Sequence, residues 1–326
     1  MKKVRWGIVG TGVIAHRFAN AIKNVEGARL CAVASRSKDT AEKFGGEFGI
    51  EHRFSSYEAM AESNEIDAAY IAVPHGLHAD CSILFLNAGK AVLCEKPITV
   101  NEIELKRMIE ASEKNNAFLM EAMWARLVPG TIKLIEIVQS GALGEIMGVQ
   151  GSFCYDMSDE PGHHAIKPEY GGGSLLDVGV YGLNFASWYI DSKIQSITAA
   201  ANVNETMVDV HCCMLLKYEN GAIADLSSGM LLRKPNEGYV FGTKGYAYVG
   251  HFYAPEEIEL HINSETKKIS APYLGNGFEE QIIEVNSCIL AGKTQSDTVP
   301  LSHSMYITKQ MDEIRKIIGV KYPFDK

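Results

Sequence analysis

Short apolar runs alternate with longer amphipathic segments from residue 4 to residue 120. Continuous apolar runs are typical of strands that are buried on both faces of a sheet, and amphipathic segments are typical of helices that cover such a sheet. The alternation therefore predicts a parallel sheet flanked by helices, which is the α/β class. The predicted strands are Val4–Val9, Leu30–Ala34, Ala68–Val73, Ala91–Cys94 and Ala117–Met120, and the clearest predicted helices are Ile14–Lys23, Leu77–Ala88 and Glu102–Lys114.

The first predicted strand is followed at once by a glycine loop, Gly10-Thr11-Gly12-Val13-Ile14-Ala15. In such a loop Gly10 permits a tight turn, Gly12 leaves room for a pyrophosphate, and Ala15 lets the helix pack closely on the sheet. Amide groups at the start of the helix attract the anion. We therefore predict a Rossmann domain that binds a dinucleotide cofactor through Gly10, Thr11, Gly12, Val13 and Ile14.

After Trp124 the pattern changes to strand-like runs separated by tight turns such as Glu219-Asn220-Gly221, which favour antiparallel neighbours. The sequence thus predicts an α/β Rossmann domain over residues 1–122 and an α+β domain with an open, mainly antiparallel sheet over residues 123–326. The predicted strands of the second domain are Ile146–Tyr155, Ile194–Val203, Val208–Tyr218, Ala222–Ser228, Tyr239–Phe241, Ala247–Val249 and Ile258–Ile262, and its predicted helices are Thr131–Gln139, Leu175–Tyr189, Glu279–Leu290 and Ser304–Ile318.

One face of the predicted open sheet would be covered by helices, and the other face would need a different cover. We expect this second face to join copies of the chain into a homodimer or homotetramer. Copies of the chain are therefore the predicted protein partner.

Composition limits the other partners. The 326 residues are 46% hydrophobic with a formal charge of -9, which argues against nucleic acid, because phosphate backbones need a concentrated basic face. The longest apolar runs fall short of the about 20 residues that span a membrane, and the first residues lead directly into a strand. We predict a cytoplasmic protein that does not bind membranes. The seven cysteines lack zinc-like or disulfide-like spacing, so we expect reduced thiols and no metal.

The end of the second predicted strand indicates which dinucleotide is bound. NAD-binding proteins of this kind usually carry an acidic residue about 20 residues beyond the glycine loop, whereas this strand ends in Ala34-Ser35-Arg36-Ser37-Lys38. Arg36 could pair with a 2′-phosphate and stack on adenine, and Ser35 could donate to the same phosphate. We predict NADP and leave acceptance of NAD open. The alternative is that Arg36 and Lys38 are ordinary solvated charges.

Lys96 is the strongest catalytic candidate in the first domain, because Cys94-Glu95-Lys96-Pro97 ends a predicted strand. The proline restricts the backbone of the lysine, and open parallel sheets bind ligands along this edge. Beside a nicotinamide ring, Lys96 could hydrogen-bond the oxygen on the carbon that gains or loses a hydride. We therefore assign both Glu95 and Lys96 to cofactor contact. The alternative is that Glu95 forms a solvated ion pair with another group.

A second strand end, Val73-Pro74-His75-Gly76-Leu77-His78, should pass over the middle of the cofactor. Parallel strands end at one edge of the sheet, so this loop should lie near the glycine loop. We assign the cofactor-contacting role to its backbone and to its histidines. The alternative is that the histidines are structural or exposed. The residues assigned are Val73, Pro74, His75 and His78.

Gly171-Gly172-Gly173 leads into a predicted helix that carries Asp177 and Tyr181. The glycines bring the backbone close to another group, and residues four apart on a helix share a face. Lys96 and Tyr181 would make a proton-transfer pair, because mutual proximity and the charge of the nicotinamide would lower their pKa values, which are otherwise too high for exchange at neutral pH. The alternative is that Asp177 is a buried helix-start carboxylate and that Tyr181 is a core aromatic residue.

These motifs together resemble the glucose-fructose oxidoreductase, inositol dehydrogenase and rhizopine-catabolism (Gfo/Idh/MocA) family over essentially the whole chain. The resemblance rests on the glycine loop, Glu95-Lys96-Pro97, Glu121-Ala122-Met123-Trp124-Ala125-Arg126 and Asp177-Val178-Gly179-Val180-Tyr181. The chain looks most like the dimeric dihydrodiol dehydrogenase-like branch. The resemblance implies a Rossmann domain followed by an open-sheet domain whose flat face makes the oligomer.

The resemblance also implies roles for single residues. Tyr181 matches the general acid or base of the tyrosine branch, with Lys96 assisting, whereas inositol-dehydrogenase-like members carry histidine at that position. Trp124 and Arg126 match positions that border the cofactor and the substrate. Relatives often carry arginine shortly before the glycines, where this chain has His163-His164-Ala165-Ile166-Lys167-Pro168. This departure weakens any transfer of substrate, and it makes His164 a candidate for substrate contact.

We therefore expect an NADP-dependent oxidoreductase that moves a hydride between nicotinamide C4 and a hydroxyl-bearing carbon of a sugar, polyol or cyclic diol. Tyr181 would transfer the hydroxyl proton, Lys96 would hold the substrate oxygen, and Asp177 would orient substrate hydroxyls. Trp124 and Phe153 would form apolar walls. Relatives of the family include a glycosidase that uses bound NAD transiently and a repressor that binds dinucleotide without turnover, so both alternatives stay open. The presence of Lys96, Asp177 and Tyr181 favours the enzyme.

Overall fold

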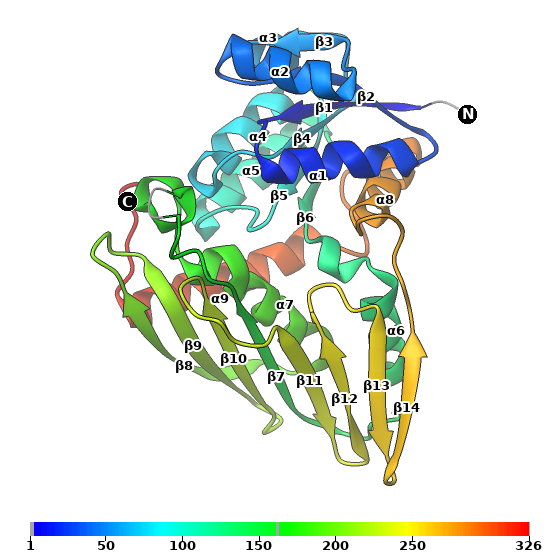
Figure 1. Ribbon diagram of the computed structural model, residues 1–326, viewed down its shortest axis with the longest axis vertical. Coiled ribbons are helices and arrows are strands. Elements are labelled where there is room, and N and C mark those ends of the chain that lie inside the picture. The colour runs from blue at the N-terminus through cyan, green and yellow to red at the C-terminus, as the bar shows by residue number, and fades with distance from the viewer. Residues whose placement is uncertain (1–2, 161–162, 326) are drawn as a thin grey trace. The chain divides into compact units, whose positions relative to one another are not determined.

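The computed structural model describes residues 3–160 and 163–325, except for the side chain of His164. The chain divides into two units by its contacts (Figure 1). The first unit consists of Met1–Trp124 and Leu274–Tyr306, and the second of Ala125–Tyr273 and Ile307–Lys326. This differs from the predicted division into 1–122 and 123–326, because the chain returns to the first unit after the second sheet.

A parallel sheet lies at the centre of the first unit, as predicted. Within the described residues its strand order is β3-β2-β1-β4-β5-β6, and every neighbouring pair is parallel. The order reverses between β1 and β4, and folds of this type bind ligands at the carboxyl ends of the strands beside such a reversal. The strands are β1 (Val4–Val9), β2 (Ala28–Ala34), β3 (His52–Phe54), β4 (Ala68–Ile71), β5 (Ala91–Glu95) and β6 (Leu119–Ala122).

Helices cover both faces of this sheet. On one face, Phe18 of helix α1 stacks on Tyr70 of β4 with 3.8 Å between ring centroids. On the opposite face, Phe85 of α4 and Leu105 of α5 share a core with Ile71. Asn101 caps α5 as a helix-start side chain, accepting from the Glu104 N–H at 2.9 Å. The helices of this unit are α1 (Val13–Ala21), α2 (Lys38–Phe48), α3 (Tyr57–Glu62), α4 (His78–Asn87), α5 (Glu102–Asn115) and α8 (Glu279–Leu290).

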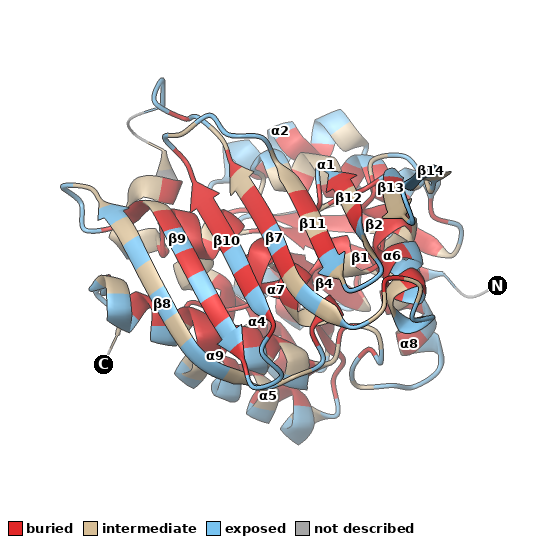
Figure 2. Cartoon of the chain, turned by 90° about the horizontal axis from the view of Figure 1, so that it is seen from below, coloured by how far each residue is buried: buried red, intermediate tan, exposed pale blue. Residues whose placement is uncertain are grey.

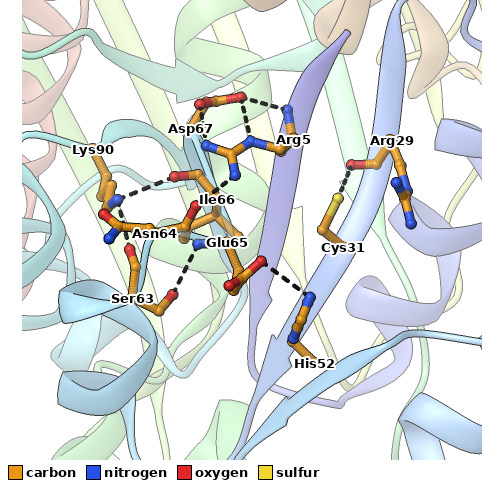
Figure 3. A network of polar contacts seen from close by, with 10 residues as sticks. All are labelled: Arg5, Arg29, Cys31, His52, Ser63, Asn64, Glu65, Ile66, Asp67 and Lys90. Carbon is orange, nitrogen blue, oxygen red and sulfur yellow. Dashed lines mark hydrogen bonds and ion pairs between the residues drawn. The ribbon is translucent and has the colours of Figure 1, made fainter.

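A polar network lies at the amino-terminal edge of the first sheet, which is opposite to the carboxyl edge (Figure 3). The Arg5 side chain pairs with Asp67, which precedes β4, at 2.8 Å, and the Arg5 backbone N–H donates to the same carboxylate at 2.9 Å. Lys90 donates to the carbonyl oxygens of Ser63 and Ile66 at 2.8 and 3.1 Å, and burial lowers its pKa. The network fixes the segment from Ser63 to Asp67, which precedes β4. This segment lies at the other end of the strands from the carboxyl edge.

The second unit contains a larger, mainly antiparallel sheet, which confirms the predicted fold class. Within the described residues its order is β14-β13-β12-β11-β7-β10-β9-β8, and only β7 and β10 pair in parallel. The strands are β7 (Ile146–Cys154), β8 (Ile194–Val203), β9 (Asp209–Tyr218), β10 (Ile223–Gly229), β11 (Glu237–Gly242), β12 (Gly245–Gly250), β13 (Glu257–Ile262) and β14 (Glu265–Ser270).

One face of the second sheet packs against helix α7 (Val180–Tyr189), which contacts β7 and β10. Figure 2 looks onto the opposite face, where buried and exposed residues alternate along most of β9 and the first half of β10, and no helix of the described residues lies over the strands. The unit also contains α6 (Pro129–Gln139), and α9 (Leu301–Ile318) runs from the first unit into the second. Among the described residues, no helix covers this face, as the sequence predicted, although the loop before β11 contacts it where Ser152 donates to the Pro235 carbonyl at 2.5 Å.

No helix within the described ranges is long and apolar enough to cross a membrane. All seven cysteines are free thiols in the described structure, and six of them are buried. The cytoplasmic location stays a prediction.

Candidate functional site

The glycine loop lies between β1 and α1, and its two glycines serve different needs. Gly10 has φ +104°, and a Cβ on it would lie 2.3 Å from the carbonyl oxygen of Ala72. Gly12 precedes α1 in extended geometry, and a Cβ there would have no atom of the described residues within 4 Å. Ala15 is fully buried against the sheet. The fold itself therefore requires Gly10, whereas Gly12 borders open space.

The start of α1 has the properties of an anion site. No side chain of the described residues caps it, and its first turn contains no acidic residue. Val13 is 90% exposed, and Thr11 and Ile14 are half-buried. Uncapped N–H groups and the helix dipole together favour a phosphate at such a position. The residues present thus fit the pyrophosphate of a dinucleotide.

The loop after β2 separates the two predicted phosphate-reading residues. Ser35 is buried, and its hydroxyl lies 2.6 Å from the Thr40 hydroxyl, which itself donates to the Ser37 carbonyl. The proton of Ser35 therefore points to Thr40, and the Ser35 hydroxyl shapes the turn. Arg36 is exposed at the same strand end. Its charge and hydrogen bond act against the burial that raises the pKa of Tyr57, so Arg36 lies close to that ring.

The loop after β4 places its residues unevenly. Val73, Pro74 and His75 are half-buried, but His78 is fully buried. The two ring nitrogens of His78 face the carbonyl oxygens of Pro97 and Val73 at 2.8 and 2.9 Å. Burial lowers the pKa of His78 to about 4, so the ring is neutral at pH 7. His78 thus connects the loop after β4 to the loop after β5, which fits the structural alternative, and its cofactor contact stays a prediction.

Glu95 and Lys96 end β5 with opposite exposures. The Glu95 carboxylate is buried and accepts from the Tyr70 hydroxyl and from the Lys96 backbone N–H. Burial raises the pKa of Glu95 to about 6, although the Lys96 charge and the Tyr70 hydrogen bond act in the opposite direction. The carboxylate therefore supports the strand end from inside, and its burial does not fit a solvated ion pair. Its cofactor contact stays a prediction.

Lys96 itself is half-buried, and its peptide bond to Pro97 is cis. Its charge lowers the pKa of two buried carboxyls, Glu95 and Glu121, whose pKa values burial raises. Glu121 accepts from the Ile98 N–H at 3.1 Å and from the Ser304 hydroxyl at 2.6 Å. Lys96 therefore lies near two buried carboxyl groups at the carboxyl edge of the sheet.

Trp124 is almost completely buried in the first unit. The Arg17 guanidinium carbon lies 4.5 Å from the Trp124 ring centroid and 4.4 Å from that of Phe278, and the two rings are 5.2 Å apart. Arg17 also donates to the Asn276 carbonyl at 2.6 Å. Sequence reasoning missed this clamp, because Arg17 and Phe278 are far apart in the chain. The clamp fixes the plane of Trp124.

The second unit holds the remaining predicted residues. Phe153 stacks on Tyr253 at 4.1 Å between ring centroids, and the Tyr181 ring lies 5.4 Å from Phe153 and 5.8 Å from Tyr253. These three rings form an aromatic cluster that includes the proposed proton-transfer group. Tyr253 was missed, because it lies in a loop without periodicity.

Arg126, another predicted residue, also belongs to the second unit. It is half-buried, and this burial lowers its pKa.

Asp177 lies on a π-helical turn, Leu175–Gly179, that leads into α7. The predicted single α-helix over Leu175–Tyr189 therefore has an irregular start, and such turns are frequent at functional sites. The Tyr155 hydroxyl donates to Asp177 Oδ2. Tyr155, which follows β7, was missed in the sequence.

The glycine-rich stretch before this turn packs against the protein itself. A Cβ on Gly172 would lie 2.4 Å from the Ala165 carbonyl oxygen, and a Cβ on Gly173, with φ +121°, would lie 2.4 Å from Asp209 Oδ1. The buried Asp209 carboxylate accepts from the Ser174 hydroxyl and from the Leu175 N–H, both at 2.7 Å. The side chain of His164 lies outside the described residues, so its predicted substrate contact has no structural counterpart here.

Each unit therefore gathers its own share of the predicted residues. The carboxyl edge of the first sheet collects the residues that follow β1, β2, β4, β5 and β6, and the second unit collects the aromatic cluster with its carboxylate. In the described residues, no cluster of three or more metal-ligating side chains is arranged to hold a metal ion. An uncapped helix start and a strand-end lysine in the first unit, and a tyrosine hydrogen-bonded to a carboxylate in the second, are features found in the class of dinucleotide-dependent oxidoreductases.

The chain belongs to the Gfo/Idh/MocA oxidoreductase family, as its motifs suggested. Residues 4–123 match the family model of an oxidoreductase family with an NAD-binding Rossmann fold, and residues 131–248 match the GFO/IDH/MocA C-terminal domain. The trans-1,2-dihydrobenzene-1,2-diol dehydrogenase of Mus musculus is 35% identical over 334 residues, and that of Homo sapiens is 31% identical over 335 residues. Each alignment covers 99% of both chains.

Solved structures share the same fold. KijD10, a 3-ketoreductase from Actinomadura kijaniata solved with NADP and TDP-benzene, is 25% identical, with a TM-score of 0.89 over 97% of this chain and 98% of that one. The aldose-aldose oxidoreductase of Caulobacter crescentus, solved with glycerol, has a TM-score of 0.90 over 97% of each chain at 24% identity. The second likeness is evidence for the fold alone.

Proposed function

We propose that the protein is an NADP-dependent dehydrogenase or reductase that acts on the CH–OH groups of a cyclic diol, polyol or sugar, with NAD as an alternative cofactor. The observation that carries this proposal is the half-buried Lys96 near two buried carboxyls, at the carboxyl edge of a sheet whose first helix has an uncapped start. Full-length relatives that oxidise a cyclic diol, by their names, support the substrate class.

The cofactor would be held by groups that the first unit presents at one sheet edge. The start of α1, with Gly10, Thr11, Gly12, Val13 and Ile14, would bind the pyrophosphate. Arg36 would pair with the 2′-phosphate, and the backbone of the loop after β4 would border the cofactor's middle. NADP in the KijD10 structure supports this choice of cofactor. When bound, the nicotinamide supplies the site that accepts or gives the hydride.

Lys96 and Tyr181 would divide the proton chemistry. Tyr181 would take the proton of the substrate hydroxyl in oxidation and return it in reduction. The ammonium of Lys96 would hydrogen-bond the substrate oxygen and stabilise the negative charge that develops on the phenol oxygen. Asp177 is only half-buried, which argues against the alternative of a buried structural carboxylate. Tyr181 is 6% exposed, so its burial also fits the alternative of a core aromatic residue.

The substrate would lie against aromatic rings with its hydroxyls toward a carboxylate. Phe153 and Tyr253 form a stacked pair beside Tyr181, and rings of this kind suit the apolar face of a six-membered ring. Asp177 would accept hydrogen bonds from substrate hydroxyls. This combination favours a compact cyclic substrate with more than one hydroxyl group.

The proposed activity is tested by mixing the purified protein with NADP or NAD and a panel of cyclic diols, inositols and sugars. Absorbance of the reduced nicotinamide reports turnover. We expect reduction with NADP and one class of polyol, and a lower catalytic efficiency with NAD. Binding of dinucleotide without any reduction across the panel would contradict the proposal and would favour the NAD-assisted glycosidase or the dinucleotide sensor.

We also propose that the uncovered face of the second sheet joins two copies into a homodimer. Tyr239 and Phe241 of β11 stack at 5.6 Å, and Tyr246 of β12 packs flat on His261 at 4.3 Å. Phe241 and Tyr246 are 37% and 36% exposed, and Leu215 and Ile223 are more exposed still. An apolar, aromatic patch on a regular sheet suits a self-complementary interface.

A further inference from the structure

Tyr155 places a second phenol next to Asp177, one of the proposed catalytic residues. It directly follows β7, whose Phe153 belongs to the aromatic cluster. Its hydroxyl donates to Asp177 Oδ2, and both side chains are half-buried in the same unit. No role has been given to Tyr155 in the proposed proton transfer.

The environment of Tyr155 suits a permanent donor. Burial raises the pKa of its phenol, and the neighbouring Asp177 raises it further through charge and hydrogen bond. A phenol that keeps its proton at working pH can only donate to the carboxylate. Tyr155 is therefore a poor proton-transfer group, which leaves that role to Tyr181.

Asp177 is consequently held both through the backbone of its turn and through its side chain. The turn that carries it is anchored by Asp209, which accepts from the Leu175 N–H and the Ser174 hydroxyl at 2.7 Å. Its side chain is fixed by the Tyr155 hydroxyl. A carboxylate held in one orientation can select a partner hydroxyl by position, because binding requires little further ordering.

We propose that Tyr155 is a positioning residue for Asp177, and that the pair reads a second substrate hydroxyl on the carbon next to the one that is oxidised. The inference rests on the proposed function and deepens it to vicinal diols, and the 1,2-diol in the names of the full-length relatives supports hydroxyls on adjacent carbons. A site built to hydrogen-bond a substrate hydroxyl discriminates against the analogue that lacks it, because the protein group is then left unpaired. Removing Tyr155's donor should weaken that discrimination.

The test compares trans-cyclohexane-1,2-diol with cyclohexanol as substrates of the wild type, Tyr155→Phe and Tyr306→Phe. Tyr306 is an exposed tyrosine of α9 in the first unit and serves as the matched control. For Tyr155→Phe we expect kcat/KM for the diol to fall about tenfold, mainly through KM, since one hydrogen bond to a charged group is lost. Turnover of cyclohexanol should change less than about twofold, and Tyr306→Phe should match the wild type.

Thermal unfolding and NADP affinity of each variant separate loss of fold from loss of recognition. Equal losses on both substrates, or an undiminished kcat/KM for the diol, would overturn the role of Tyr155 while leaving the dehydrogenase intact. A wild type that oxidises neither these alcohols nor any member of the sugar panel would instead overturn the proposed function, and the assignment of Tyr155 with it.

Discussion

Lys96 lies close to two carboxyls that the protein has removed from water. Glu95 and Glu121 are both buried, and burial raises the pKa of each, whereas the ammonium of Lys96 lowers them. A cation with such a support keeps a defined position at the strand end. The positive charge of Lys96 would contribute most where negative charge develops during the reaction.

Replacing Lys96 by Met should therefore separate catalysis from binding. We expect kcat to fall by about 10²- to 10⁴-fold, while the affinity for NADP changes little, because the pyrophosphate site at α1 is untouched. Steady-state kinetics and a fluorescence titration with NADP measure the two effects. Turnover at the wild-type rate would remove Lys96 from the mechanism.

Asp209 gives a pH dependence whose sign can be worked out. Burial raises its pKa from 3.8 to about 6 in the folded protein. The folded state therefore holds the proton more strongly between these values, so the contribution of Asp209 to stability is present at low pH and is lost as the pH rises through about 6. The loss amounts to roughly 3 kcal/mol.

Asp209→Asn should remove this dependence and keep both hydrogen bonds, since the amide oxygen can accept from Ser174 and Leu175. Urea unfolding of both proteins at pH 4.5 and pH 8 measures it. We expect the variant to gain stability relative to the wild type at the higher pH. Parallel pH dependences of the two proteins would show that Asp209 does not titrate in this range.

At the scale of single residues, the sequence predicted which residues lie at strand ends, but not how deeply they are buried. Lys96 and Arg36 could be placed because a strand pattern shows where its last residue lies. The burial of His78, Glu95 and Trp124 depends on contacts with distant segments, such as Pro97 for His78 and Phe278 for Trp124. No local pattern carries that information.

At the scale of elements, the predictions were strongest where apolar periodicity is long. Strand β1 and helix α8 have the predicted bounds. The short strand β3, the helices α2 and α3, and the edge strand β14 were missed, because their exposed residues leave no continuous apolar pattern. The π-helical turn could not be predicted, since one extra residue in a turn barely alters periodicity.

The glycine loop allows one element-level prediction with an internal control. Gly12→Ala should fold normally, because its Cβ meets no atom of the described residues, but it should weaken NADP binding by about tenfold or more by narrowing the phosphate site. Gly10→Ala should lower the stability by at least about 2 kcal/mol, because it adds a clash with Ala72 to an unfavourable φ.

Thermal unfolding and isothermal titration with NADP measure the two variants side by side. Two variants with equal stability would contradict the structural role of Gly10. Unchanged NADP affinity in Gly12→Ala would contradict the pyrophosphate site at the start of α1.

At the scale of the whole molecule, the sequence predicted two domains but not the path between them. The return of Leu274–Tyr306 to the first unit depends on contacts such as Asn24 with Glu279 at 2.9 Å and Trp6 with Asn286 at 3.0 Å. Those pairs are separated by more than two hundred positions in the chain. The sequence pattern of α8 predicts an amphipathic helix, but it does not indicate which of the two sheets the helix packs against.

The proposed homodimer makes a prediction at the same scale. Phe241→Glu would bury a charge in the interface, so we expect a dimeric wild type and a monomeric variant at micromolar concentration. Ile103→Glu, on an exposed position of α5 in the first unit, is the matched control and should stay dimeric. Light scattering after size exclusion measures the masses, and a monomeric wild type would refute the interface.

The most direct test of the central claim follows the hydride itself. The wild type would be incubated with NADP and a cyclic vicinal diol that carries deuterium on its carbinol carbons, and the reduced cofactor would be analysed by mass spectrometry. Hydride transfer from the CH–OH carbon predicts that the deuterium appears on the nicotinamide of the product. Reduced cofactor without the label, or no reduced cofactor from any diol or sugar tested, would contradict the account.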